Sequence, residues 1–132
     1  MTAAAPPIPP FTTEPFYHVR PWGGRAMETS LGKRIPEGTV AEAWEVSAHP
    51  NGVSRAASGR HAGRGLDEIV RENGPALLGR GVYERHGGEF PVLIKLIDVN
   101  ALASVQVHPD DAGAMRLEGW PRGKTEAWYI IS

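Results

Sequence analysis

Glycine and proline set the strongest constraint on how this chain can fold. The sequence has 132 residues, and it contains 16 glycines and 12 prolines. Glycine favours tight turns, and proline removes a backbone donor and interrupts long helices and central strands. So many turn residues favour a fold of short strands and small helices, and a length below ~150 residues is typical of one domain.

The composition excludes several classes of protein. The chain has no cysteine, which rules out disulfide scaffolds, cysteine-based metal sites and thiol nucleophiles. A formal net charge of -1 provides no basic footprint for nucleic acid. No apolar run approaches the ~20 residues of a membrane span, and the N-terminus lacks the features of a signal peptide. We therefore expect a cytoplasmic protein with no nucleic-acid or membrane partner.

The distribution of proline predicts two regions. Residues 1–15 hold five of the twelve prolines, together with alanine and threonine, and are interpreted as a flexible tail. Residues 16–132 are interpreted as the folded domain.

Apolar patterns in this domain predict five strands. These segments are residues 41–48, 53–57, 90–99, 102–108 and 126–131. Asn51-Gly52 is a strong turn signal between the first two. Residues 90–99 are almost continuously apolar, which predicts a buried strand although Pro91 lies near its start. The pattern indicates an all-β sandwich or barrel with a helical insertion.

Two short helices are also predicted. Leu66, Ile69 and Val70 have helical spacing, and Asn73-Gly74-Pro75 is expected to end that helix. Asp110 or Asp111 can cap a second helix that runs through Leu117.

One strand and the start of the next carry a candidate metal site. Ser104, Gln106 and His108 alternate, so on a strand their side chains share one face. An amide oxygen and an imidazole nitrogen can both bind a divalent metal, and the carboxylate of Glu126 can complete a three-ligand site suited to zinc. The alternative is that these groups form the polar face of a half-exposed strand.

Lys124 and the remaining histidines also carry side chains that can bind a ligand. Lys124 lies two residues before Glu126, where its ammonium can hold a phosphate or a sugar oxyanion, or can simply be a surface lysine. The remaining histidines lie among glycine, proline and arginine in expected loops, and we predict that they are not ligands. They are His18, His49, His61 and His86.

Five motifs together resemble a known family. They are PWGG at 21–24, AEAWEVS at 41–47, FPVLIKLID at 90–98, LASVQVHPDD at 102–111 and GKTEAWYII at 123–131. In this order they resemble the N-terminal part of the type I mannose-6-phosphate isomerases, which are zinc enzymes of the cupin superfamily. The resemblance is strongest to the shorter bacterial branch. It implies a cupin-like β-barrel, or jelly roll, of which this chain is expected to be the N-terminal half.

The resemblance also implies roles for individual residues. Gln106, His108 and Glu126 match zinc-ligand positions, and Ser104 and Lys124 match positions that line the sugar-phosphate pocket. The family's candidate catalytic arginine corresponds to a position beyond Ser132, so the catalytic residue stays unassigned.

The implied activity is the interconversion of mannose 6-phosphate and fructose 6-phosphate, in which a proton moves between C1 and C2 with zinc (Zn2+) as Lewis acid. The alternatives are a non-catalytic cupin-like module that binds a metal or a sugar phosphate, or one half of a split enzyme. The expected partner is a small-molecule sugar phosphate. A second polypeptide or self-association is expected to complete the barrel, and the chain alone is expected to be a weak or inactive isomerase.

Overall fold

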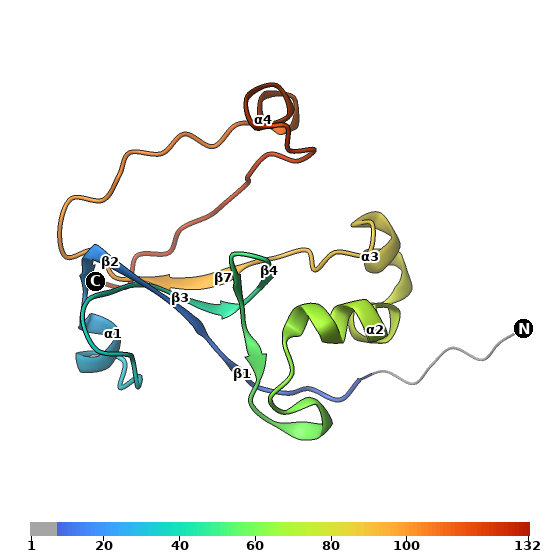
Figure 1. The fold of residues 1–132 in the computed structure, drawn as a ribbon, viewed down its shortest axis with the longest axis horizontal. Coiled ribbons are helices and arrows are strands. Elements are labelled where there is room, and N and C mark those ends of the chain that lie inside the picture. Colours follow the sequence, from blue (N-terminus) through green and yellow to red (C-terminus); the bar gives the residue numbers. More distant parts are fainter. Residues whose placement is uncertain (1–7) are drawn as a thin grey trace, which may run out of the picture. The chain divides into compact units, whose positions relative to one another are not determined.

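The structure is a computed structural model that describes residues 8–132. It consists of two units, one that ends at Leu102 and one formed by Ala103–Ser132. Each unit has its own internal contacts and is described by itself. Seven strands and four α-helices occur in the described part of the chain (Figure 1).

Part of the expected tail takes part in the first unit. Residues 1–7 lie outside the described residues, but the backbone N–H of Ile8 donates to the carbonyl of Ala76 at 3.3 Å. Further along, β1 (Thr13–Glu14) pairs antiparallel with β6 (Arg55–Ala56). Residues 8–14 are therefore tied to the folded body.

A three-stranded antiparallel sheet organises the first unit. Its order is β2 (Phe16–Gly24), β3 (Val40–Val46) and β7 (Ile94–Ile97), with β3 in the centre (Figure 1). The pairing sets Trp44 opposite Phe16 on one side and opposite Lys95 on the other. The central position explains why β3 carries the best-buried side chains of the sheet.

The core of this unit lies against one side of the sheet. Met27, Val40 and Ala43 are buried at its centre, and partly buried apolar side chains surround them: Tyr17, Ile35 and Leu96. The short helix α1 (Ala26–Thr29) contributes Met27. Its first N–H groups have no partner inside the helix, and the carboxylate of Asp98 accepts from the N–H of Ala26 at 2.6 Å.

A turn forms within Pro50-Asn51-Gly52, where the sequence predicts one. Strands β4 (Ala48–His49) and β5 (Gly52–Val53) make a small antiparallel hairpin, in which Pro50 and Asn51 form the turn and Gly52 already pairs with His49. Ser47, just before β4, is fully buried, and its hydroxyl donates to the carbonyl of Gly52 at 2.7 Å. The hydrogen bond satisfies a polar group that burial would otherwise leave unpaired.

The prediction that Asn73-Gly74-Pro75 ends a helix is wrong. Helix α2 (Leu66–Leu78) continues through Pro75 and ends before Gly79, and α3 (Arg80–Arg85) follows at once. Packing overrides the local signal, because Ile69 and Val70 are buried and Gly74 lies so close to the ring of Tyr83 that no Cβ would fit. Tertiary contacts regularly outweigh helix propensity in this way.

The strand predicted over residues 90–99 is shorter and more exposed than expected. Only Ile94–Ile97 forms β7, which lies at the edge of its sheet, and Ile94 is 54% exposed. The prediction of a buried strand is therefore wrong. Pro91 cannot donate to a ladder, which is consistent with pairing that begins only after it.

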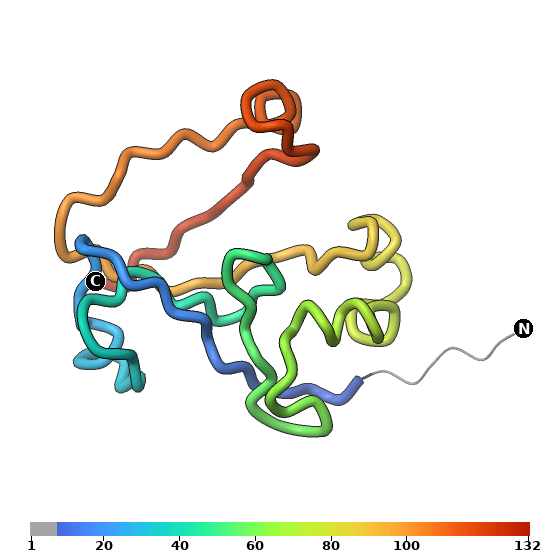
Figure 2. Tube along the Cα trace, viewed as in Figure 1, coloured from blue at the N-terminus to red at the C-terminus, as the bar shows by residue number. Residues whose placement is uncertain are grey.

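The second unit consists of two long segments joined by a helix. Helix α4 (Asp111–Glu118) begins as predicted, since the Asp110 carboxylate accepts from the N–H of Gly113 at 2.7 Å. It ends at Gly119, whose φ of 70° is the left-handed conformation that glycine favours at this position. The path out to α4 and back is clear in the tube of Figure 2.

The strands predicted over residues 102–108 and 126–131 do not form. Both segments lie outside every sheet of the described chain, and Val105, Val107 and Ile130 are 95%, 87% and 72% exposed. A strand needs a ladder partner for its backbone groups, and neither segment has one here. Strands nevertheless outnumber helices, and no closed barrel occurs within residues 8–132.

Candidate functional site

Contacts between the residues that flank α4 bring the two segments of the second unit together. The N–H of Lys124 donates to the carbonyl of Pro109 at 3.2 Å, and the N–H of Gly123 donates to the Asp111 carboxylate at 2.8 Å. Gly123 lies against the backbone of Pro109 and Asp110, where a Cβ atom would have no room. These contacts place the residues after Gly123 beside the residues before Pro109.

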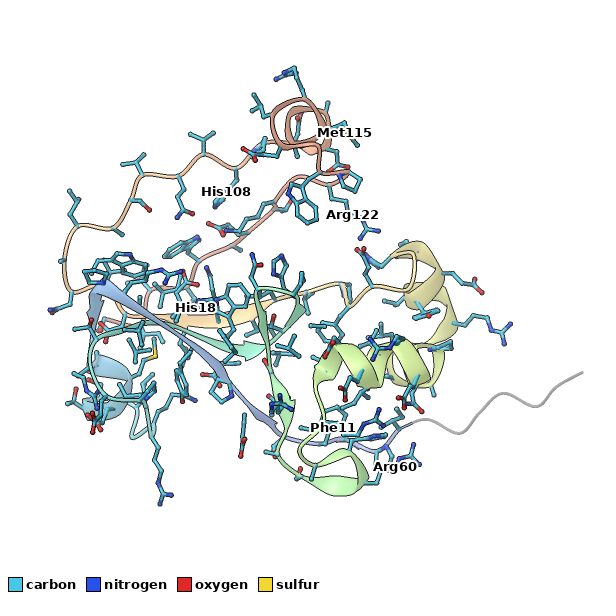
Figure 3. All side chains as sticks on the ribbon, viewed as in Figure 1. Phe11, His18, Arg60, His108, Met115 and Arg122 are labelled. Carbon is cyan, nitrogen blue, oxygen red and sulfur yellow. The ribbon has the colours of Figure 1, made fainter. Side chains whose placement is uncertain are left out.

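His108 and Glu126 lie side by side where these two segments approach each other. Nε2 of His108 lies 2.9 Å from Oε1 of Glu126, although 18 residues separate them in sequence. Both side chains are 24% exposed. Figure 3 labels His108 on the segment that leads to α4. The structure thus joins two of the three predicted ligands.

Lys124 completes this cluster. Its ammonium nitrogen lies 2.9 Å from Oε2 of Glu126 and 3.3 Å from Nε2 of His108. A single imidazole nitrogen carries either a proton or a lone pair. Nε2 of His108 cannot donate to Glu126 and accept from Lys124 at the same time. Only one of these two hydrogen bonds can therefore form at a given moment.

The Glu126 carboxylate is strongly held in its ionised form. Hydrogen bonds from Lys124, from Trp128 and from His108, with Lys124 the largest cause, lower its pKa from 4.5 to about 2. The Trp128 indole N–H donates to Oε1 at 2.7 Å. At neutral pH the carboxylate is therefore charged, as a metal ligand must be.

Gln106 and Ser104 contact each other on the same segment. The Gln106 amide nitrogen donates to the Ser104 hydroxyl at 3.2 Å, and both residues are exposed. This bond uses the amide nitrogen, so the amide oxygen is the atom that could bind a metal. Gln106 follows the predicted alternation with His108, but its hydrogen bond is with Ser104 and not with the cluster.

The chemistry of these residues fits a zinc ion. Two ligands ~2.0–2.1 Å from a tetrahedral zinc lie about 3.3–3.4 Å apart, so the hydrogen-bonded pair of His108 and Glu126, now 2.9 Å apart, needs to open by only about 0.5 Å. The Lys124 ammonium already places a positive charge against both atoms. Within the described residues no group of three histidine, cysteine, aspartate or glutamate side chains forms a metal site. A third protein ligand taken from the described residues would have to be of another type, such as an amide.

The other histidines belong to the first unit, and the expectation that they occupy loops is only partly correct. His18 lies on β2 and His49 on β4, and His61 in the 3-10 helix η1 (Gly59–His61) is buried. Arg60 donates to Nε2 of His61 at 3.0 Å, and the N–H of Asn51 donates to Nδ1 of His49 at 3.1 Å. That these residues are not ligands stays a prediction.

Sequence reasoning missed a second charged cluster, which lies on the sheet of the first unit. Lys95 on β7 donates to Glu42 on β3 at 3.1 Å, and the Trp44 indole N–H donates to the other carboxylate oxygen at 2.6 Å. Burial alone would raise the pKa of Glu42, but these hydrogen bonds and the charge of Lys95 outweigh it and lower the pKa. The single lysine inside the apolar 90–99 run was the signal for this pair.

Comparison with known proteins identifies the family. The family model described as Phosphomannose isomerase type I, catalytic domain, matches residues 11–123. The chain belongs to the type I phosphomannose isomerase family. The matched range includes Ser104, Gln106 and His108 and stops just before Lys124 and Glu126.

Individual members of the family agree. The mannose-6-phosphate isomerase of Streptococcus mutans is 44% identical over 115 residues, which cover 87% of this chain and 34% of that protein. The probable mannose-6-phosphate isomerase GmuF of Bacillus subtilis is 42% identical over 92% of this chain and 37% of its own length. The chain therefore spans little more than a third of these relatives.

A solved structure confirms the fold. The mannose 6-phosphate isomerase from Bacillus subtilis superposes with a TM-score of 0.78 and 40% identity, over 92% of this chain and 37% of that one. The predicted cupin-like β architecture, as part of a larger phosphomannose isomerase fold, is thus confirmed, without a closed barrel in residues 8–132. Over the same residues no helix combines the length and apolar character needed to cross a bilayer.

Proposed function

We propose that this chain forms part of the active centre of a mannose-6-phosphate isomerase. The observation that carries the proposal is the 2.9 Å approach of His108 to Glu126. This contact brings together two motifs of the phosphomannose isomerase family from the two segments that flank α4. The names of the relatives support mannose 6-phosphate as the substrate, and the family resemblance implies fructose 6-phosphate as its product.

In this proposal Gln106, His108 and Glu126 hold a zinc ion. Zinc, when bound, would act as a Lewis acid that stabilises negative charge on a sugar oxygen while a proton moves between C1 and C2. Ionised Glu126 provides the charge that a divalent cation requires, and neutral His108 provides a lone pair on Nε2. The base that moves the proton stays unassigned.

Lys124 and Ser104 are proposed to bind the sugar phosphate. A cation that binds His108 and Glu126 repels the Lys124 ammonium, which now lies 2.9 Å from Glu126. The flexible lysine side chain is half-exposed, so it can turn away and pair with an anionic substrate. The Ser104 hydroxyl can donate to a substrate oxygen from the same segment as the metal ligands.

A second candidate function is a binding module or one half of a split enzyme. The specific observation in its favour is that the chain spans 34–37% of its relatives. In this case a second polypeptide or another copy of the chain would supply the remaining walls of the site.

Metal content and turnover, measured together, test the proposal. We expect the purified chain to retain about one zinc per chain after gel filtration, and His108→Ala and Glu126→Gln to lose it. His49→Ala is the matched control, because His49 is an exposed histidine on a hairpin of the first unit. Zinc that survives both ligand substitutions would refute the site. Conversion of mannose 6-phosphate by the zinc-loaded chain, alone or with a complementing polypeptide, then separates the isomerase from the binding module.

A further inference from the structure

Trp128 has a contact that the proposed ligand set does not explain. Its indole N–H donates to Oε1 of Glu126 at 2.7 Å, and the same oxygen faces Nε2 of His108 at 2.9 Å. Lys124, Glu126 and Trp128 alternate along one extended segment, so their side chains can meet on one side of it. Trp128 is 60% exposed, so apolar burial does not account for its position.

The contacts of the carboxylate show why this bond matters. Glu126 lies outside every sheet and is only partly buried, so packing does not fix its flexible side chain. Its orientation depends on Lys124 at Oε2 and on Trp128 and His108 at Oε1. Of these three partners, Lys124 is repelled when a cation binds, and His108 becomes a ligand itself.

The indole is the partner that can stay in place. It is uncharged and is a donor only, so it neither repels a cation nor competes as a ligand. A carboxylate oxygen has two lone pairs and can accept from the indole while it binds a metal. Partners of this kind fix the orientation of metal ligands, and their loss typically costs 10–100-fold in metal affinity.

We propose that Trp128 is a positioning residue, which holds the Glu126 carboxylate toward His108 so that both can bind one divalent cation. The inference rests on the proposed function, since it takes His108 and Glu126 as ligands. Trp128 acts through Glu126 and contacts neither the cation nor the substrate.

Removal of the single N–H donor tests this role. In Trp128→Phe the aromatic ring remains but the donor is lost, and we expect zinc affinity to fall 10–100-fold in competition with a chromophoric chelator. Trp120→Phe is the matched control, because Trp120 is also 60% exposed and lies in the same unit. Its affinity should match that of the wild-type chain. Trp128→Leu provides the same comparison if the phenylalanine variant precipitates.

Cobalt substitution adds a readout that a purely structural role would not move. The visible absorption bands of bound Co2+ report the arrangement of its ligands. We expect these bands to change in Trp128→Phe and to stay unchanged in Trp120→Phe, while both variants keep the far-ultraviolet circular dichroism of the wild-type chain.

The outcomes separate this inference from the proposed function. If Glu126→Gln and His108→Ala lose zinc but Trp128→Phe binds it with wild-type affinity and spectrum, the positioning role is wrong and the proposed site stands. If the wild-type chain binds no zinc, the proposed function fails and the role of Trp128 fails with it. Equal losses in the Trp120 and Trp128 variants would show a general effect of the surface aromatics and would also overturn the assignment.

Discussion

Gly123→Ala should separate the two halves of the candidate metal site. A Cβ at this position would lie 2.6 Å from the carbonyl carbon of Asp110 and 2.8 Å from its Cα, and closer still to the carbonyl oxygen of Pro109. Contacts below 3.0 Å essentially never occur for Cβ atoms, so the backbones must move apart by at least about 0.4 Å. All three obstacles are backbone atoms, and no side chain can rotate to make room.

A shift of this size is large for a metal centre. Ligand distances in such sites are held to about 0.2 Å, and the displacement acts directly between His108 and Glu126. It also strains the 3.2 Å hydrogen bond from the N–H of Lys124 to Pro109. We expect the zinc affinity of Gly123→Ala to fall at least tenfold, and amide exchange at Lys124 to become faster.

Gly119→Ala is the matched control. Gly119 ends α4 with a φ of 70°, and no atom lies near enough to obstruct an added methyl group. The substitution costs about 1 kcal/mol of backbone strain, which lowers stability but leaves the Pro109–Lys124 approach in place. If Gly123→Ala binds zinc as tightly as Gly119→Ala, the close approach of the two segments does not form the site.

Four further predictions concern stability and turnover. Because the pKa of Glu42 is lowered in the folded chain, the ionised carboxylate stabilises the fold above the ordinary pKa of 4.5. This contribution disappears as pH falls through the lowered pKa. The free energy of unfolding of Glu42→Gln, measured with urea, should therefore fall less steeply toward acid pH than that of the wild-type chain. Asp110→Ala removes the cap of α4 and should destabilise this helix by ~1 kcal/mol, measured by helical circular dichroism. Ile69→Ala changes a fully buried position and should lower the free energy of unfolding of the first unit by ~2–5 kcal/mol, measured in urea. The zinc-loaded chain by itself should isomerise mannose 6-phosphate at least ~100-fold more slowly than an intact family member. Gln106 is exposed, and a misplacement of an active-site group by ~1 Å already lowers the rate by that factor. Equal rates in a coupled assay would contradict this.

The sequence predicted best those elements whose signals are local. The Asn-Gly hairpin and the Asp110 cap of α4 each depend on residues within a few positions of one another, and both formed as expected. The end of α2 was mispredicted because the helix continues past Gly74, against which the ring of Tyr83 packs. It ends instead at Gly79, whose φ is 77°, and the pattern within residues 66–78 does not show which of the two glycines stops the helix.

The same distinction applies to the charged residues. Alternation along a single strand suggested Gln106 and His108, but it could not pair Lys95 with Glu42, which lie 53 residues apart. That pairing follows from the register of β3 and β7, and a shift of one residue would turn Lys95 to the other face. Register depends on the whole sheet, so a polar residue in an apolar run indicates a partner without identifying it.

The two strand predictions failed because neither segment has a partner strand with which to pair. Residues 102–108 and 126–131 have the alternating apolar side chains of strands, yet a strand is a property of a pair of segments and not of one. What joins them here is one backbone hydrogen bond, from Lys124 to Pro109, and the side-chain contacts of His108, Lys124 and Glu126. The apolar side chains of these segments, such as Val105 and Ile130, stay exposed. A cation bound between His108 and Glu126 would therefore stabilise the second unit as well as form its proposed site, because it would link two segments that have no ladder of backbone hydrogen bonds to hold them.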